Sequence, residues 1–227
     1  MPHCATLVAT LSLVSAAALA RTEDRDVPEF DAVEVASGIR VTIEIGPRSP
    51  VRVEANDDLL ALVDTHVEEG ALHVGFKPHT HWRREGRVTV SIKAPQIRAI
   101  AASGGSLVRA ALTRATQSAL EASGGSELHI RGIDAERLAV EGSGGSVLEM
   151  EGRAGTLDLQ MSGGTRLDAS NLSVKDVTLQ ASGGSTGKLH AQGRIRGSLS
   201  GGSELHVRGG ATTAVTTTGG SSVETGD

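Results

Sequence analysis

A four-residue motif, Ser-Gly-Gly-Ser or a close variant, recurs along the second half of this chain at nearly constant spacing. The copies begin at Ser103, Ser123, Ser143, Ser162, Ser182, Ser200 and Thr218. Successive copies are therefore 20, 20, 19, 20, 18 and 18 residues apart. Self-similarity at a fixed period is typical of repeat architectures, in which equivalent segments stack on one another.

Apolar residues take matching places in these repeats. The third position before the motif holds Ile100, Leu120, Val140, Leu159, Leu179, Gly197 and Val215. The second position after it holds Val108, Leu128, Leu148, Leu167, Gly187 and Leu205. Apolar and polar residues alternate around these positions, which predicts half-buried strands. Further glycines near the middle of the repeat, such as Gly132 and Gly152, indicate a second turn. Each repeat is therefore two or three short strands joined by tight corners.

Strands of this kind bury their apolar face only when coils stack, about 4.8 Å apart. The sequence therefore predicts an all-β fold, a single-stranded parallel β-helix (solenoid) with coils of about 20 residues. A propeller is disfavoured because its blades need about 40 residues. A sandwich is disfavoured because its strands would not keep this strict register. The crossover rule favours right-handed coils.

Residues 30–98 are rich in strand patterns but do not share the register of the later repeats. Asn56 is placed as the N-cap of a helix from Asp57 to Thr65, and a hairpin is expected around Gly70. We expect this irregular β-rich segment to cap the β-helix or to form its first coil. Residues 30–227 are thus predicted to be one domain, with an N-terminal part at 30–98 and coils at 99–227.

The first 20 residues have the features of a secretory signal peptide, with an apolar stretch that ends in Ala18-Leu19-Ala20. An uncleaved anchor or a misassigned start is the alternative. Residues 21–29 are interpreted as a short linker. Cleavage would remove Cys4, the only cysteine, so the mature chain would have no disulfide. It would also remove the apolar stretch, and no other stretch of the sequence is expected to form a stable membrane span. We expect an exported protein in the periplasm or on the surface of a bacterium.

Composition excludes some partners. The chain has only 3 aromatic residues (2 Phe, 1 Trp, no Tyr) and a net charge of −5. Proteins that bind single-stranded nucleic acids stack the bases on aromatic rings, and phosphate contacts need a basic surplus. No nucleic-acid partner is therefore expected. The 29 glycines do not follow a Gly-X-Y period, which argues against collagen.

Residues with catalytic or metal-binding chemistry do not form a recognisable motif. The pair His79 and His81, with Glu85 as a third ligand, lacks a metal-site spacing, so no metal or cofactor is predicted. One outward ladder is expected along the coils, in the order Arg109, His129, Glu149, Asp168, Lys188 and His206. The acidic residues considered for catalysis are Asp57, Asp58, Asp64, Glu68 and Glu69. They have no defined separation, so no catalytic residue is assigned and the chain is predicted not to be an enzyme.

Several segments together resemble a known family. They include residues 30–35 (FDAVEV), 37–43 (SGIRVTI), 51–60 (VRVEANDDLL), 70–74 (GALHV) and 88–92 (VTVSI), followed by the Ser-Gly-Gly ladder. From Phe30 to about Val223 the chain resembles the auto-transporter adhesin head domains, also called GIN domains. The resemblance implies an exported β-helical domain of the bacterial envelope and brings no catalytic motif.

We therefore expect a non-enzymatic envelope module for adhesion, binding or scaffolding. The alternatives are a periplasmic regulatory or stress-associated protein and, less favoured, a carbohydrate-active enzyme. The expected partner is an envelope protein or a surface glycan whose identity the sequence does not give. Self-association through the coil ends is a further expectation.

Overall fold

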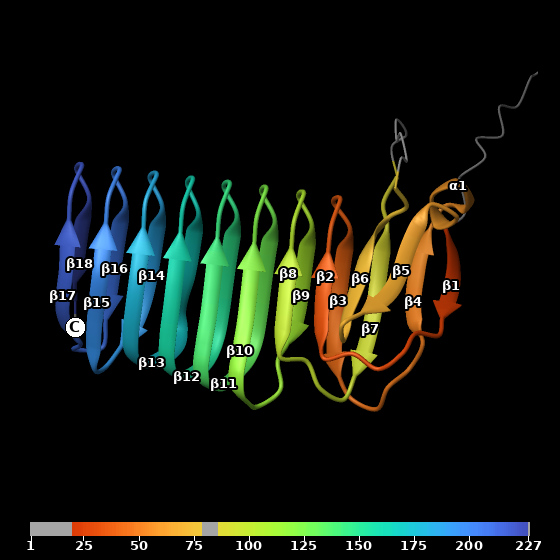
Figure 1. Cartoon of the computed structure of the whole chain (residues 1–227), viewed down its shortest axis with the longest axis horizontal. Helices are drawn as coiled ribbons and strands as arrows, with labels where there is room; N and C mark the ends of the chain where they lie inside the picture. Colours follow the sequence, from red (N-terminus) through yellow and green to blue (C-terminus); the bar gives the residue numbers. More distant parts are fainter. Residues whose placement is uncertain (1–19, 79–85, 227) are drawn as a thin grey trace, which may run out of the picture.

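The chain folds into a β-solenoid with coils of about 20 residues, as the period predicts (Figure 1). This computed structural model describes residues 20–78 and 86–226. The predicted signal peptide, apart from Ala20, lies outside these residues. The 18 strands formed by these described residues belong to one continuous hydrogen-bonded sheet that winds around the core. Among the residues described, no helix has the length and apolar character needed to cross a membrane.

The winding sheet has two long faces. The face turned toward the viewer in Figure 1, here called the groove face, is built from β5 (Val63–Glu68), β6 (Ala71–Phe76), β2 (Ala32–Val35), β8 (Ala99–Ala102), β10 (Ala115–Ala122), the last parts of β11 (Glu127–Gly142), β12 (Val147–Met161) and β13 (Arg166–Ala181), then β15 (Arg194–Leu199) and β17 (Thr212–Thr217).

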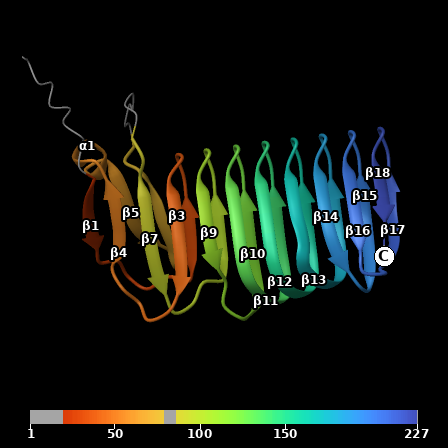
Figure 2. The same cartoon turned by 180° about the vertical axis from the view of Figure 1, so that it is seen from behind.

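The opposite face, here called the ladder face, is seen in Figure 2. It consists of β1 (Arg21–Arg25), β4 (Val51–Ala55), β7 (Thr89–Ala94), β3 (Arg40–Ile45), β9 (Leu107–Ala111), the first parts of β11, β12 and β13, then β14 (Thr186–Ala191), β16 (Glu204–Arg208) and β18 (Ser222–Thr225).

A complete coil has three strand segments, as β11 shows. Along it every second residue is buried, except at two bends where successive buried residues are three positions apart. These bends lie between Ile130 and Ile133 and between Ala135 and Leu138. The pairing register with β12 also shifts between Ile130 and Ile133. Two long segments are therefore joined by a short middle one, within the range of two or three strands that the sequence indicates.

Aliphatic residues in axial rows fill the interior. One such row runs through Val33, Ile100, Leu120, Val140, Leu159 and Leu179, each at most 2% exposed. Full burial of such a side chain stabilises a fold by about 1.5–3 kcal/mol. The two phenylalanines, Phe30 and Phe76, are only partly buried against this core. A core built from small aliphatic layers explains why so few aromatic residues are needed.

The Ser-Gly-Gly corners stack in a single column. Their first glycines have φ between 60° and 69° and their second glycines between 75° and 81°. A Cβ added to a first glycine would lie 2.8–3.2 Å from the backbone nitrogen of the preceding corner. Glycine is therefore required both by its backbone angle and by the close stacking.

The last residue of the first six corners points inward, and Ser221 of the seventh is only half-buried. Ser106, Ser126, Ser146, Thr165, Ser185 and Ser203 are all 0% exposed. The hydroxyl of Ser126 donates to the carbonyl of Ser123 at 2.7 Å, and Ser106, Thr165, Ser185 and Ser203 make the same contact. The hydroxyls of these residues therefore satisfy backbone carbonyls of the corners.

The expectation that residues 30–98 lie out of register is wrong for β2 and β3, whereas β4 and β5 pair antiparallel with their neighbours and do lie outside the register. Strands β2 and β3 form a coil between the β6–β7 and β8–β9 coils, with Val33 opposite Ile100 and Val41 opposite Val108. Its corner continues the glycine column, because Ser37 has φ of 66° at the position of a first glycine. Strands β6 and β7 stack on one side of this coil, and β8 and β9 stack on the other. The order of the coils along the solenoid therefore differs from their order in the chain.

Two local predictions also need correction. The helix α1 spans only Asp57–Leu60, although Asn56 caps it by accepting a hydrogen bond from the Leu59 amide at 3.1 Å. Residues Val63 to Thr65 belong instead to β5, because Val63 is buried opposite Phe76 in the expected hairpin. The segment interpreted as a linker contains β1, which pairs antiparallel with β4 at the end of the ladder face.

Candidate functional site

One outward row of side chains crosses the groove face. Register pairing places in this row His66, His73, Glu34, Ala101, Glu121, Glu141, Gln160, Gln180, Ser198 and Thr216. Neighbouring strands lie about 4.8 Å apart, so the row presents carboxylates, amides and hydroxyls at a regular interval along the solenoid axis.

Two hollows follow this row beneath the corners. The first has a volume of about 310 Å³ and is lined by Glu121, Glu141, Gln160 and Gln180, with the first serines of the adjacent corners above them. The second, of about 430 Å³, continues toward the N-terminal strands and also contacts Glu121. The two hollows share Glu121, and we call them together the binding groove; its first part is mainly polar, whereas its second part also has apolar walls, including Val74 and Phe76.

The charges in the middle of the binding groove are not balanced. Glu121 and Glu141 occupy directly paired positions on adjacent strands. Within the described part of the chain, neither carboxylate has an ion pair. Like charges at paired positions destabilise a sheet. A surface that keeps such an arrangement is suited to a ligand that donates hydrogen bonds or carries positive charge.

The ladder face differs because several of its carboxylates contact histidines on the neighbouring strand. The predicted order from Arg109 to His206 is confirmed by the strand register. His129 Nδ1 lies 2.7 Å from Glu149 Oε2, and His206 Nδ1 lies 3.0 Å from Glu224 Oε2. This row links neighbouring coils, so we assign it a structural role.

Asp168 shows how the ladder balances its charges. Partial burial raises the pKa of the Asp168 carboxyl, but two effects outweigh it and leave the pKa below its ordinary value. Hydrogen bonds from Ser170 favour the ionised form, and so does the positive charge of Lys188 on the next strand.

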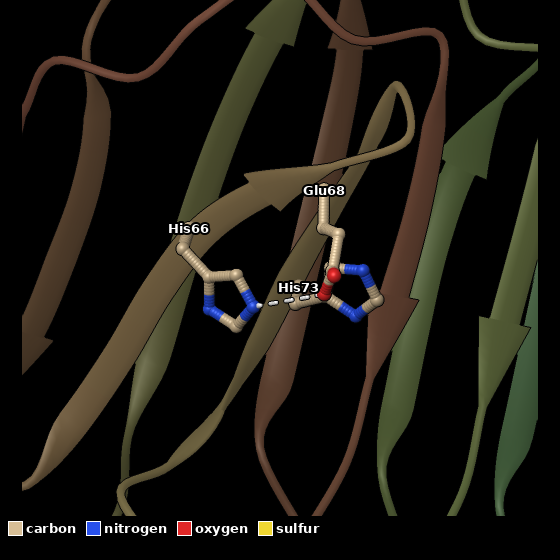
Figure 3. A group of neighbouring side chains, drawn as sticks. All are labelled: His66, Glu68 and His73. Atoms are coloured by element: carbon tan, nitrogen blue, oxygen red, sulfur yellow. Dashed lines mark ion pairs between the residues drawn. The ribbon is translucent and has the colours of Figure 1, made fainter.

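A cluster of His66, Glu68 and His73 lies at the N-terminal end of the binding groove (Figure 3). The two imidazole rings are stacked, with centroids 4.9 Å apart and an interplanar angle of 13°. His66 Nδ1 lies 3.0 Å from Asp64 Oδ2, and His73 Nδ1 lies 3.1 Å from Glu34 Oε2. Sequence inspection missed this cluster because the turn of the β5–β6 hairpin brings its members together.

The residues considered from sequence for metal binding or catalysis are placed as follows. The trio His79, His81 and Glu85 lies outside the described residues. Asp57 pairs with Arg21 at 3.2 Å, away from the binding groove. Asp64 and Glu68 belong to the histidine cluster, where they are candidates for binding chemistry.

Stacked coils, a column of glycine corners and a polar groove on one flat face define the chain as a repeat-type β-solenoid. The family model described as "Putative auto-transporter adhesin, head GIN domain" matches residues 29–211. The chain therefore belongs to the GIN domain family, as its resemblance to these domains indicates.

Several solved structures share this fold. A putative adhesin from Bacteroides fragilis NCTC 9343 is 19% identical, with a TM-score of 0.82 over 91% of this chain and 97% of that one. A putative lipid binding protein from Parabacteroides distasonis ATCC 8503 is 12% identical, with a TM-score of 0.72 over 92% and 97%. A putative adhesin from Parabacteroides merdae ATCC 43184 is 16% identical, with a TM-score of 0.66 over 92% and 96%. A search of the curated proteins finds no match.

Proposed function

We propose that this chain is a non-enzymatic binding module of the bacterial cell envelope, which attaches to a surface glycan through its binding groove. The observation that carries the proposal is the row of Glu121, Glu141, Gln160 and Gln180, whose polar groups face solvent on a regularly stacked scaffold. The family and the putative adhesins that share the fold support a binding role.

The chemistry of the row favours a hydroxyl-rich polymer. Carboxylates accept hydrogen bonds, whereas amides and serine hydroxyls both donate and accept them. A polymer that lies along the solenoid axis would meet an equivalent side chain about every 4.8 Å. With few aromatic residues for stacking, each contact is weak, and affinity must come from several contacts along one chain.

An apolar ligand fits the row of Glu121, Glu141, Gln160 and Gln180 poorly, because the hollow along it is mainly polar. Ile45, at 37% exposure, is the one large hydrophobic side chain that is exposed in the described parts of the chain. Binding of an acyl chain needs a continuous apolar surface. The lipid-binding description of one solved structure is therefore not extended to this chain.

Binding to envelope fractions tests the proposal. Glu141→Lys places a cation in the groove, whereas Glu204→Lys makes the same charge change on an exposed site of the ladder face. We expect Glu141→Lys to weaken binding at least tenfold and Glu204→Lys to leave it unchanged. Equal binding by both variants would contradict the groove as the binding surface.

The same fractions distinguish the two classes of partner. Treating them with glycan-degrading enzymes should abolish binding, whereas treating them with a protease should leave it intact. Loss of binding after the protease alone would show a protein partner and overturn the glycan assignment.

A further inference from the structure

We propose that the β5–β6 hairpin binds one divalent metal ion, with zinc the best fit, through His66, Glu68 and His73. This site is separate from the four polar residues on which the proposed function rests. Its test, metal binding by the purified protein, does not depend on glycan binding.

The hairpin register brings the three ligands together. His66 and His73 are directly paired across the antiparallel strands, and Glu68 lies two residues beyond His66 on the same side of β5. One ligand atom from each residue lies within 4.8 Å of the others. His66 Nε2 is 4.0 Å from Glu68 Oε2 (Figure 3). Zinc binds imidazole and carboxylate groups at about 2.0–2.2 Å, so small side-chain movements bring these atoms to binding distance.

Two further carboxylates prepare the histidines for binding. Asp64 contacts Nδ1 of His66 and Glu34 contacts Nδ1 of His73, at 3.0 and 3.1 Å. A neutral imidazole that donates its Nδ1 proton to a carboxylate presents an unprotonated Nε2 to a metal. Metal-bound histidines in proteins nearly always have such a partner. Both histidines of this cluster have one.

The stacked rings show what must change when the metal binds. A metal lies in the plane of each imidazole that binds it, whereas these rings are nearly parallel and 4.9 Å apart. One ring must therefore rotate out of the stack. The side chain of His66 is 51% exposed and that of His73 is 29% exposed, so His66 has more freedom to turn.

The donor set favours zinc over calcium. Two imidazoles and one carboxylate match zinc sites that keep a further position open, whereas calcium takes six to eight oxygen ligands. The hollow of about 430 Å³ that contacts both histidines would leave this position to water or to an oxygen of a bound molecule.

A second histidine–carboxylate group provides a matched control. His129 lies between Glu149, at 2.7 Å, and Glu127, at 3.7 Å, on the ladder face. It has the carboxylates of the proposed site without a second imidazole. A general affinity of surface histidines for zinc would involve both groups, whereas the proposed site would involve only the hairpin.

Calorimetric titration of the purified protein with zinc chloride, and with calcium chloride for comparison, tests the proposal. We expect one zinc ion per chain and no comparable binding of calcium. His66→Gln and His73→Gln should each lower zinc affinity at least tenfold, and His129→Gln should not change it. Asp64→Asn should lower affinity about 10–100-fold through its effect on His66.

Other results would overturn the proposal. One is the absence of stoichiometric zinc binding by the parent protein. The other is an equal loss of zinc affinity in His73→Gln and His129→Gln. The hairpin variants alter exposed or half-exposed side chains, and their unfolding temperatures without metal serve as the folding control. Zinc should raise the unfolding temperature of the parent but not that of His73→Gln, since a ligand that binds only the folded state stabilises it.

Discussion

Gly144 lies so close to Gly124 in the neighbouring corner that a Cβ at position 144 would be 3.0 Å from the Gly124 nitrogen. The next residue, Gly145, has similar left-handed backbone angles, but a Cβ there would meet nothing within 4 Å. Both glycines of one corner are thus required by their backbone conformation. Only the first is also required by the close stacking of neighbouring corners.

Alanine substitutions at these two positions measure the requirements separately. Gly145→Ala should lower the free energy of unfolding by about 1–2 kcal/mol, because only the left-handed backbone is penalised. Gly144→Ala should cost about 1–3 kcal/mol more, because the added Cβ also pushes against the next coil. Denaturant unfolding of both variants checks this difference, and Gly144→Val should be worse still. Equal losses at 144 and 145 would contradict the stacking described here.

Removal of a buried corner hydroxyl should also destabilise the solenoid. Ser126 is 0% exposed and donates to the Ser123 carbonyl at 2.7 Å. Ser126→Ala leaves this carbonyl with the Ser126 backbone amide, at 3.2 Å, as donor, so we expect a loss of about 0.5–1.5 kcal/mol in denaturant unfolding. Ser126→Thr keeps the hydroxyl, as Thr165 does in its own corner, and should retain most of the stability.

A buried hydroxyl elsewhere in the core should have the opposite effect. Ser118 is 5% exposed, and its Oγ has no hydrogen-bond partner among the described residues. It occupies a row in which the next coils have Leu138, Leu157 and Val177. Ser118→Ala removes an unpaired polar group and should raise the free energy of unfolding by about 1 kcal/mol. A lower stability would indicate that the hydroxyl has a partner in solution.

The repeat predicts the coils, the glycine corners and the ladder face, because all three follow from residues at the same place in each period. It does not predict that the coil of β2 and β3 lies between later strands. That arrangement depends on which strands pair with one another, and strands far apart in the sequence can pair as well as strands that are close. The corner of this coil has Ser37 where the other corners have glycine, so the sequence motif does not identify it as one of the stacked corners.

The histidine cluster has the same origin. His66 and His73 are seven positions apart in the chain. They become paired only because the turn at Glu69 and Gly70, both with positive φ, fixes the hairpin register. A search for ligands at close sequence spacing therefore finds His79 and His81 but not this pair. The binding groove, by contrast, has a signal in the repeat, because Glu121 and Glu141 each stand two positions before their motif and the strand register pairs them.

A coil-to-coil ion pair should make stability depend on pH in the acid range. Arg153 donates two hydrogen bonds to Asp134, at 3.0 and 2.8 Å, and these bonds hold the pKa of the Asp134 carboxyl below its ordinary value of 3.8. A lowered pKa in the folded state stabilises the fold above pH 3.8, and this contribution is lost as the pH falls through the folded value.

Unfolding curves between neutral pH and pH 2 check this contribution. Asp134→Asn should lose stability at neutral pH and show a weaker decline on acidification. High salt should reduce the difference, because the pair is exposed to solvent. Asp158→Asn removes an exposed carboxylate from the groove face and serves as the control. The same acid decline in Asp134→Asn and in the parent would contradict the assignment.

The paired glutamates of the binding groove should show opposed effects on stability and binding. Glu141→Gln removes a like-charge contact with Glu121, so the unfolding temperature should rise slightly, most clearly at low salt. The same change removes a charged acceptor from the groove and should weaken attachment to envelope fractions. Glu151→Gln, whose parent carboxylate lies 3.9 Å from Arg131, should not raise stability and should leave attachment unchanged. A gain in stability without a loss of attachment would show that ligand binding does not use this carboxylate.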